Sequence, residues 1–433
     1  MNQTLKAALF SAGIIAGIGF FAPAGAVTLD DLEKKLVQQE EEIKALRDEL
    51  AQLKVAQTVQ TQTIQQQTAV IENTVNANAE NREALSATTV SSYGEIVYTR
   101  PLNSTKDTQV DVARAVIAMS HRFDSQTKMV SEFEWEHAVT SDEDSGESEV
   151  EQLYIEHLLD NGLRVKGGLF LMPVGLLNTS HEPTSYYGVK RNFVETAIIP
   201  TTWREVGVGI SGTTANSLTW DAGLTTGFNL SKWDPTAQEG RDSPLASVHQ
   251  EGQLARASNL SVYGALNWQD VPGLLLGASI FTGQAGQNTP GSLLNESSIT
   301  MFDVHGRYQA GNWDTTALFA RGSISHTADY NATIAGQPTP IPSSFEGGYV
   351  QVAYRIWKSP QYALSTFVRA ERFNTAKTFS SESFDSYIKP DTQVATVGLN
   401  LKVGEGVVLK ADYQNFKNNS AEDRLNLGLG YSF

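Results

Sequence analysis

Apolar and polar residues alternate one by one along much of this chain, and the alternation is clearest at its C-terminus. Leu425, Leu427, Leu429, Tyr431 and Phe433 alternate there with polar residues and glycines. Successive side chains of a β-strand point to opposite faces, so this segment predicts a strand with one apolar and one polar face.

The same pattern recurs in about sixteen segments from Ser91 to Phe433, as outer-membrane barrels show. It is regular at residues 301–310, 349–358, 391–403 and 407–414, and less regular at 109–123 and 149–159. We interpret the irregular segments as strands whose outer face packs on a neighbouring protomer. The pattern predicts an all-β transmembrane fold over residues 91–433. This is an antiparallel outer-membrane β-barrel of about 16 strands, with lipid outside and water inside.

The connections support this fold. Short links occur near Asp124, at 160–162, near Ala215, at 272–273, at Gly311, at Pro360 and at Gly404, and they alternate with longer ones. Outer-membrane barrels segregate short turns and long loops in this way, and an even strand count puts both ends on the short-turn side. Tryptophans near strand ends, among them Trp203, Trp313 and Trp357, suit interfacial aromatic girdles.

The N-terminus predicts export. Lys6 precedes an apolar stretch over 7–21 and then the small residues of Pro23–Ala26, which indicates a signal peptide over residues 1–26. An N-terminal anchor helix is the alternative. The apolar stretch is short for it, because a helix needs about 20 apolar residues to span a bilayer.

A separate unit is predicted over residues 27–90. Apolar residues, and further along glutamine and asparagine, recur in steps of three and four from Leu29 to Leu85, with no proline or glycine between them. A heptad repeat of this length predicts an α-helical coiled coil. A coiled coil needs partner chains, so we expect a homo-oligomer. A trimer is preferred, although two strands also fit the heptads. The barrel topology places this stalk in the periplasm, where contact with peptidoglycan is one role for it.

A sixteen-stranded barrel is wide enough to leave an aqueous channel, so the strand count predicts a pore. The third long connection, Pro173 to Thr202, carries apolar residues such as Ile198 and Ile199 that a solvated loop would not need. Folding into the lumen would bury them. The residues then expected at the constriction are His181, Glu182, Tyr186, Tyr187, Lys190, Arg191, Glu195 and Arg204.

Polar positions on the strands predict the rest of the lumen. They are Arg114, Glu134, Asp303, His305, Arg307, Arg355, Arg369, Glu371, Lys410 and Asp412. Rings of charge set ion preference, and a set of mixed sign predicts none strongly.

The block GLFLMPVGLLNTSHEPTSYYGVKRNFVETAIIPTTWREVGVGI, with FEWEHA upstream, resembles the porin family typified by the phosphate-selective porins O and P. The resemblance covers the barrel region and implies a sixteen-stranded trimeric channel whose third loop folds inward. The terminal aromatic resembles the signal for barrel insertion, and related dicarboxylate-type porins carry an N-terminal periplasmic coiled coil. Phosphate-selective members line the pore with a dense ladder of arginine and lysine. The mixed charges here depart from that pattern, so the resemblance implies the channel and leaves its solute open.

The composition narrows the functional classes. The chain has no cysteine and a net charge of -16. It offers no thiolate chemistry, and the acidic balance argues against nucleic acid, whose binding depends on clustered Lys and Arg. No phosphate-binding loop or nucleophile elbow is present, so no enzyme activity and no cofactor is predicted. The histidines are scattered, and the run Glu132, Glu134, Glu136 is interpreted as a solvated lumen face rather than a metal site.

Two functions remain. The first is a porin for passive diffusion of small polar or anionic solutes across the outer membrane. The second is a structural or adhesion anchor whose coiled coil links the barrel to the cell wall.

Overall fold

The computed structural model describes residues 87–141 and 145–433, together with seven helical positions between 30 and 44. The chain divides into two units, Met1–Ala84 and Leu85–Phe433. The predicted signal peptide and the heptad core positions of the predicted coiled coil lie outside the described residues. Within the described part, no helix is long and apolar enough to cross a membrane.

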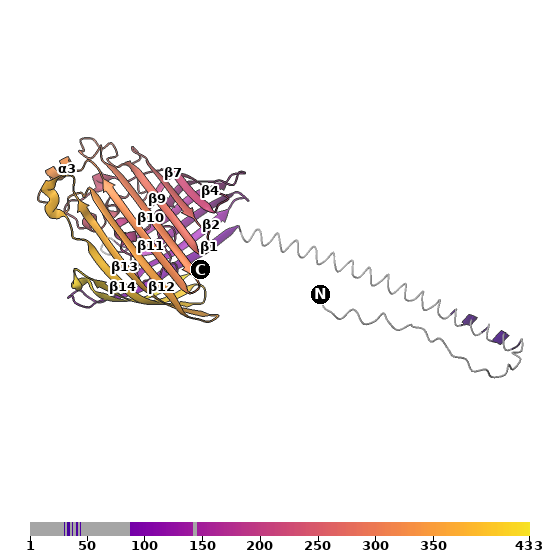
Figure 1. Ribbon diagram of the computed structural model, residues 1–433. Coiled ribbons are helices and arrows are strands. Elements are labelled where there is room, and N and C mark those ends of the chain that lie inside the picture. The colour runs from indigo at the N-terminus through magenta and orange to yellow at the C-terminus, as the bar shows by residue number, and fades with distance from the viewer. Residues whose placement is uncertain are drawn as a thin grey trace. The chain divides into compact units, whose positions relative to one another are not determined.

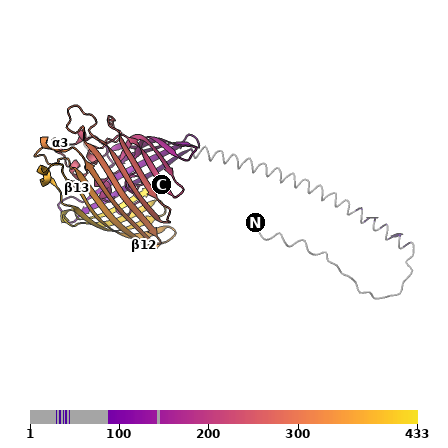
Figure 2. The ribbon, with the colours of Figure 1, turned by 45° about the horizontal axis from the view of Figure 1, so that its top comes forward.

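The second unit is a closed barrel of sixteen antiparallel strands, each paired with its neighbours in sequence, and β1 closes the ring on β16. Figures 1 and 2 show the strands running obliquely around the barrel wall. The strands are β1 Thr88–Pro101, β2 Gln109–Arg122, β3 Thr127–Glu136, β4 Ser148–Leu158, β5 Arg164–Leu171, β6 Arg204–Thr213, β7 Leu218–Thr225, β8 Ser261–Trp268, β9 Leu274–Gln284, β10 Ser298–Ala310, β11 Trp313–Ile324, β12 Ser344–Lys358, β13 Tyr362–Thr378, β14 Thr392–Val403, β15 Val407–Phe416 and β16 Arg424–Ser432. The predicted strand number and the predicted antiparallel barrel are confirmed.

Short helical segments occur in the connections. They are η1 Val194–Ile198, η2 Leu230–Lys232, α2 Glu239–Asp242, η3 Ala246–Val248, α3 Ala328–Thr333, η4 Glu382–Tyr387 and η5 Ser420–Glu422. All of them lie in long connections, and every second connection is a short turn, as the sequence predicted. We call the two ends of the barrel the long-loop end and the short-turn end.

The alternation of apolar and polar residues becomes an alternation of outside and inside. On β16, Leu427 is 46% exposed and Leu429 is 43% exposed. Asn426, on the same strand, faces inward and is fully buried; its neighbours across the sheet are Asp412 on β15 and Thr99 on β1. A soluble protein would bury the leucines, so this pattern is inverted relative to a water-soluble sheet. It requires an apolar medium around the barrel and polar contacts within it.

Two β-bulges explain why the early strands read irregularly in sequence. Arg114 pairs with Glu95 but Val112 pairs with Ile96, so Ala113 is an extra residue in β2. On β4, Gln152 pairs with Glu132 and Val150 pairs with Phe133, which leaves Glu151 as the extra residue. A bulge shifts the inside–outside phase by one residue and re-aims side chains. The irregularity therefore has a cause within the chain, whether or not a neighbouring protomer covers these strands.

The aromatic residues near strand ends divide into two groups. Trp313 and Trp357 are about half exposed at the short-turn end, as interfacial residues would be. Trp203 is different and corrects the expectation of a girdle residue. It is fully buried, and its ring lies 4.6 Å from that of Phe281 and 5.0 Å from that of Phe228. It packs in the barrel interior, because the loop that precedes it turns inward.

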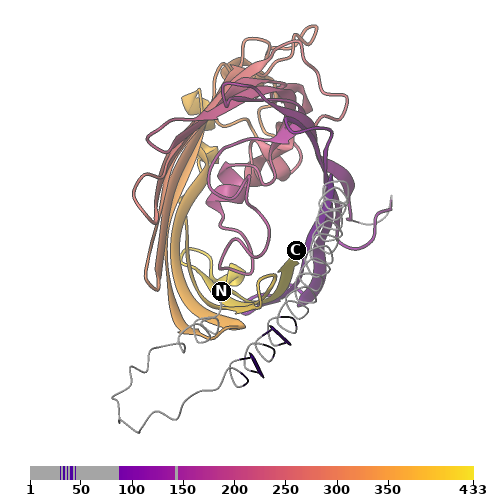
Figure 3. The ribbon, with the colours of Figure 1, turned by 90° about the vertical axis from the view of Figure 1, so that its right-hand side faces the viewer.

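The connection between β5 and β6, residues 172–203, is called the third loop. In Figure 3, which looks into the barrel, this segment follows the purple strands and crosses the interior. Its apolar residues Val194, Ile198 and Ile199 join a core cluster with interior residues of β8 to β12, including Phe281, Met301 and Phe345. The apolar content of the loop is thus buried inside the barrel, as predicted.

Candidate functional site

The third loop is fixed to the barrel wall by carboxylates that accept its backbone N–H groups. Asp303 on β10 accepts from Gly175 N at 3.0 Å, and Asp412 on β15 accepts from Val189 N at 2.6 Å. Glu371 on β13 accepts from Phe193 N at 2.6 Å. A loop inside a barrel has few neighbouring strands to pair with, so its buried N–H groups need such acceptors.

Glu195 serves the same purpose within the loop. Its Oε1 accepts from the backbone N–H groups of Leu176 and Leu177 at 2.6 and 2.7 Å. Its Oε2 accepts from Asn192 Nδ2 at 2.7 Å and from the hydroxyl of Tyr349 at 2.9 Å. Glu195 is 4% exposed. It was predicted as a constriction residue, and its contacts make it an anchor of the loop on β12.

Tyr186 lies where the loop approaches β1 and β15. Its hydroxyl donates to Glu95 Oε2 at 2.8 Å, and the ammonium of Lys410 lies 3.7 Å from the centre of its ring. Glu95 also receives a hydrogen bond from Arg114 Nε at 2.8 Å. Arg114 in turn donates from Nη2 to the His181 carbonyl oxygen at 2.6 Å. This arrangement joins a cation–π contact and a buried ion pair to the loop backbone.

Two cavities lie on opposite sides of this point. One of about 450 Å³ opens toward the long-loop end and is lined by Arg114, Tyr186, Lys190 and Arg191 among others. The other, of about 400 Å³, opens toward the short-turn end and is lined by Tyr186, Arg369 and Lys402 among others. Residues of the third loop line both cavities, and Tyr186 is the lining residue that the two cavities have in common.

The other predicted loop residues take distinct positions. Lys190 is exposed into the long-loop cavity, and Arg191, beside it, donates to Thr201. Tyr187 lines the short-turn cavity, and its hydroxyl donates to Asp314 at 3.1 Å. Glu182 accepts from the Ser185 hydroxyl at 3.0 Å. His181 is 3% exposed and points to β3 and β4, away from both cavities.

Arg204 requires a correction. It shares its strand face with Val206 and Val208, which are 38% and 56% exposed on the outside of the barrel. Its guanidinium pairs with Glu149 and, at 3.2 Å, with Glu251. Proximity in sequence to the third loop suggested a constriction residue. The side-chain phase of β6 instead places Arg204 on the outer side, beneath the loops.

The predicted lumen residues lie on the inner face. Arg307 pairs with Asp314 at 2.6 Å, and His305 Nδ1 lies 2.5 Å from Asp303. Arg369 donates to Glu371 at 2.6 Å. Glu134 is 1% exposed. Arg355 reaches the β10–β11 turn, where it donates to Asn312 at 2.8 Å, so it lies at the short-turn end and apart from the cluster around Tyr186.

Three of these interior cations keep free donors. Among the described residues, Arg114 Nη1, Arg369 Nη2 and Lys410 Nζ are buried atoms without a hydrogen-bond partner. Each belongs to a side chain that is no more than 6% exposed. An unpaired buried donor is costly unless a water or a polar ligand satisfies it, so a bound water or a ligand oxygen is expected beside each of these atoms.

Comparison with known proteins agrees with this geometry. No protein-family model matches the chain. An uncharacterized protein of Aquifex aeolicus (strain VF5) is 29% identical over 362 residues, which cover 80% of each chain. OmpF of Salmonella typhi, solved in complex with daunomycin, is 11% identical with a TM-score of 0.55, over 80% of this chain and 97% of that chain. The outer membrane channel DcaP of Acinetobacter baumannii is 9% identical with a TM-score of 0.51, over the same shares. The chain has a porin-like fold.

Several residues of this porin-like barrel were missed in the sequence. Glu95 and Asp314 hold Tyr186 and Tyr187, and Tyr93 and Glu151 lie beside His181 together with Glu132, which the sequence predicted on a solvated lumen face. On β1, β3 and β11 these polar residues alternate with apolar neighbours, and this alternation could have predicted that their side chains point inward. The signal failed on β4, because the bulge at Glu151 breaks the alternation.

Proposed function

We propose that this chain is an outer-membrane porin for passive diffusion of small polar or anionic solutes, with the third loop as its constriction. It acts as a channel and not as an enzyme. The observation that carries the proposal is the pair of cavities of about 450 and 400 Å³ that share Tyr186 on either side of the loop. A loop that crosses a polar lumen sets the narrowest point for anything that passes.

The unpaired cationic donors support the anionic part of the proposal. Lys410, Arg369 and Arg114 each keep a free donor near the shared tyrosine. The interior carboxylates Asp412, Glu371 and Asp303 are committed to backbone N–H groups of the loop. A solute with carboxylate or phosphate oxygens would satisfy the free donors. The interior remains mixed in charge, which supports a modest anion preference rather than the strict phosphate selectivity of porins O and P.

Location and assembly complete the proposal. The exposed apolar outer face, with Leu427 and Leu429 as examples, supports insertion in the lipid of the outer membrane. The heptad pattern of residues 27–90 supports a homo-oligomer, preferably a trimer, with a periplasmic coiled coil that contacts peptidoglycan or another periplasmic partner.

Planar-bilayer recording tests the function. Purified protein added to a bilayer is expected to give stepwise currents, grouped in threes if the trimer inserts as a unit. The reversal potential in a salt gradient then reports the preference for anions or cations. Protein that inserts but carries no current would refute the channel and favour the anchor function.

A further inference from the structure

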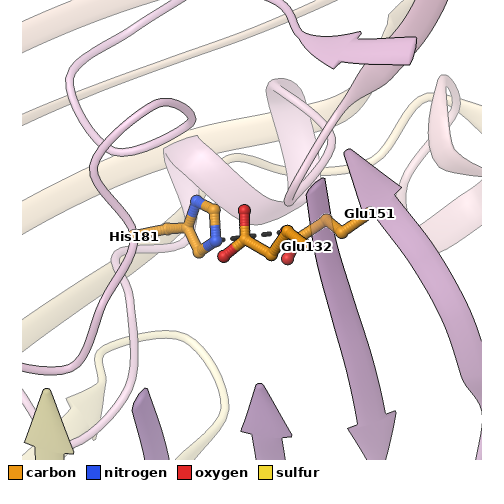
Figure 4. Close-up of side chains that lie close together, drawn as sticks. All are labelled: Glu132, Glu151 and His181. Atoms are coloured by element: carbon orange, nitrogen blue, oxygen red, sulfur yellow. Dashed lines mark ion pairs between the residues drawn. The ribbon is translucent and has the colours of Figure 1, made fainter. Parts of the chain in front are cut away.

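A second polar cluster lies away from both cavities, between the third loop and the barrel wall. It contains Glu132 on β3, Glu151 on β4 and His181 on the loop, and all three are buried. One ligand atom from each lies within 4.8 Å of the others. Figure 4 shows the imidazole and the two carboxylates turned toward one another. The sequence predicted no metal site here, because Glu132 fits the pattern of a solvated lumen face and His181 is one of several scattered histidines; Glu132 is buried instead.

The imidazole presents Nε2 to the carboxylates. Its Nδ1 lies 3.0 Å from the Asn178 carbonyl oxygen, and since a carbonyl oxygen can only accept, Nδ1 carries the proton. In the neutral ring Nε2 then has a free lone pair, 3.1 Å from Glu151 Oε1. A histidine whose other nitrogen donates to a backbone carbonyl is the usual arrangement of a metal-ligating imidazole.

The cluster holds more acceptors than donors. The Tyr93 hydroxyl lies 2.6 Å from His181 Nε2 and 3.1 Å from Glu151 Oε2, and its single proton can serve only one of them. Gln152 donates to Glu132. Glu151 Oε1 faces the His181 Nε2 lone pair at 3.1 Å and has no donor unless the imidazole is protonated. The nearby Glu134 Oε1 is buried without a hydrogen-bond partner among the described residues, and Glu151 and Glu134 are 0% and 1% exposed.

The charge balance points the same way. Glu132, Glu134 and Glu151 are buried together. Arg114 pairs with Glu95 and donates to the loop backbone, and although its Nη1 has no hydrogen-bond partner, it forms no ion pair with these three carboxylates in the described part of the chain. A protonated His181 would supply one positive charge against three carboxylates. Buried charges are stable only when paired or coordinated to a metal, so the site lacks positive charge.

We propose that Glu132, Glu151 and His181 bind one divalent transition-metal ion of the Zn²⁺ class, which fastens the third loop to strands β3 and β4. Tetrahedral Zn²⁺ with ligands at about 2.1 Å holds its ligand atoms roughly 3.4 Å apart. His181 Nε2 and Glu151 Oε1 are 3.1 Å apart, and the three ligand atoms all lie within 4.8 Å of one another, so a small adjustment of the side chains would complete the site. Tyr93 is placed to supply a fourth oxygen. An imidazole ligand favours Zn²⁺ over Mg²⁺, which requires octahedral oxygen coordination and keeps its waters.

The bulge on β4 makes the site. Glu151 is the extra residue, and it points inward together with its neighbour Gln152, so the wall carries an additional carboxylate opposite Glu132. Bulges that re-aim a side chain in this way are common beside functional sites.

The test uses the full chain in detergent, stripped with a chelator and then equilibrated with Zn²⁺. Metal analysis of the wild-type protein is expected to give about one ion per chain, retained in excess Mg²⁺. The double variant Glu151→Gln with His181→Gln is expected to lose that ion or to bind it at least tenfold more weakly. His157→Gln, which removes an exposed histidine of β4, is the matched control and is expected to bind as wild type does.

A second readout follows the loop itself. Zn²⁺ is expected to raise the melting temperature and to slow amide exchange around residues 178–182 in the wild type and in His157→Gln only. X-ray absorption of the loaded wild type is expected to show an imidazole among nitrogen and oxygen ligands, and this result does not depend on whether a variant folds. The proposal is overturned if the wild type binds no Zn²⁺, in which case protons satisfy the cluster, or if the double variant folds and binds equally.

Discussion

Lys410 is an interior cation whose removal disturbs few contacts. Its ammonium lies 3.7 Å from the centre of the Tyr186 ring and has no hydrogen-bond partner among the described residues. Lys410→Met keeps most of the length of the side chain and deletes the charge. No carboxylate loses a hydrogen bond, so the effect on conduction can be read without a large change in the loop.

The expected size follows from Coulomb's law. A unit charge about 6 Å from a passing ion contributes roughly 0.7 kcal/mol in bulk water. The sign is opposite for anions and cations, so the permeability ratio changes by about 1.4 kcal/mol, which is a factor of roughly 10. The lower effective dielectric constant beside a protein wall increases this value, and screening by the salt of the assay decreases it, so the factor is an order of magnitude.

The assay is the reversal potential of single channels in a potassium chloride gradient. Lys410→Met is expected to move the potential toward cation preference. Lys358→Met, at the exposed end of β12, makes the same chemical change away from Tyr186 and is expected to leave the potential unchanged. Equal potentials for the two variants would refute the placement of Lys410 beside the permeation path.

Three further predictions follow from the loops. Lys190→Glu with Arg191→Glu should also shift the reversal potential toward cations, and an unchanged value would place the third loop away from the constriction. Glu195→Gln should speed hydrogen exchange at the two backbone amides that this carboxylate binds by about 100-fold, the equivalent of roughly 3 kcal/mol for two charge-assisted bonds, and unchanged exchange would contradict the anchor role. Hydrogen bonds from Asn374 and its neighbours lower the pKa of Asp391 to about 2. The carboxylate therefore stabilises the fold above about pH 4, and this contribution is lost as pH falls toward 2. Asp391→Asn should lower the melting temperature at neutral pH, and the difference should shrink over that window; a constant difference would contradict the ionic origin.

The sequence predicted the barrel well because strand periodicity is a local property. Each strand carries its own inside–outside code, and the turns between strands are marked by glycine, proline and asparagine, as at Gly311 and Gly404. Both glycines adopt a positive φ in the short turns that connect β10 to β11 and β14 to β15. The inward course of the third loop was also readable, since Ile198 and Ile199 need burial that a solvated loop does not provide.

The partners of the interior charges were not readable in this way. Asp412 and Glu371 looked like channel-lining charges, but each accepts a backbone N–H of the third loop. Arg204 looked like part of the constriction and lies on the other face of its strand. Such contacts depend on how a long loop crosses the barrel, which no local pattern encodes. The cluster at His181 further requires a bulge on β4, and a bulge reverses the side-chain code on which the strand prediction rests.

These contacts change what the interior charges mean for selectivity. Counted by sign, the predicted lumen set has five cationic and four acidic side chains, and the whole chain is acidic with a net charge of -16. The carboxylates of Asp412, Glu371 and Asp303, however, accept backbone N–H groups of the loop. Glu371 also accepts a hydrogen bond from Arg369. The cationic side chains keep donors to spare. Anchoring the loop thus occupies acceptor atoms of these carboxylates without removing their charge, so the proposed anion preference depends on which cationic donors remain free and not on the net charge of the chain.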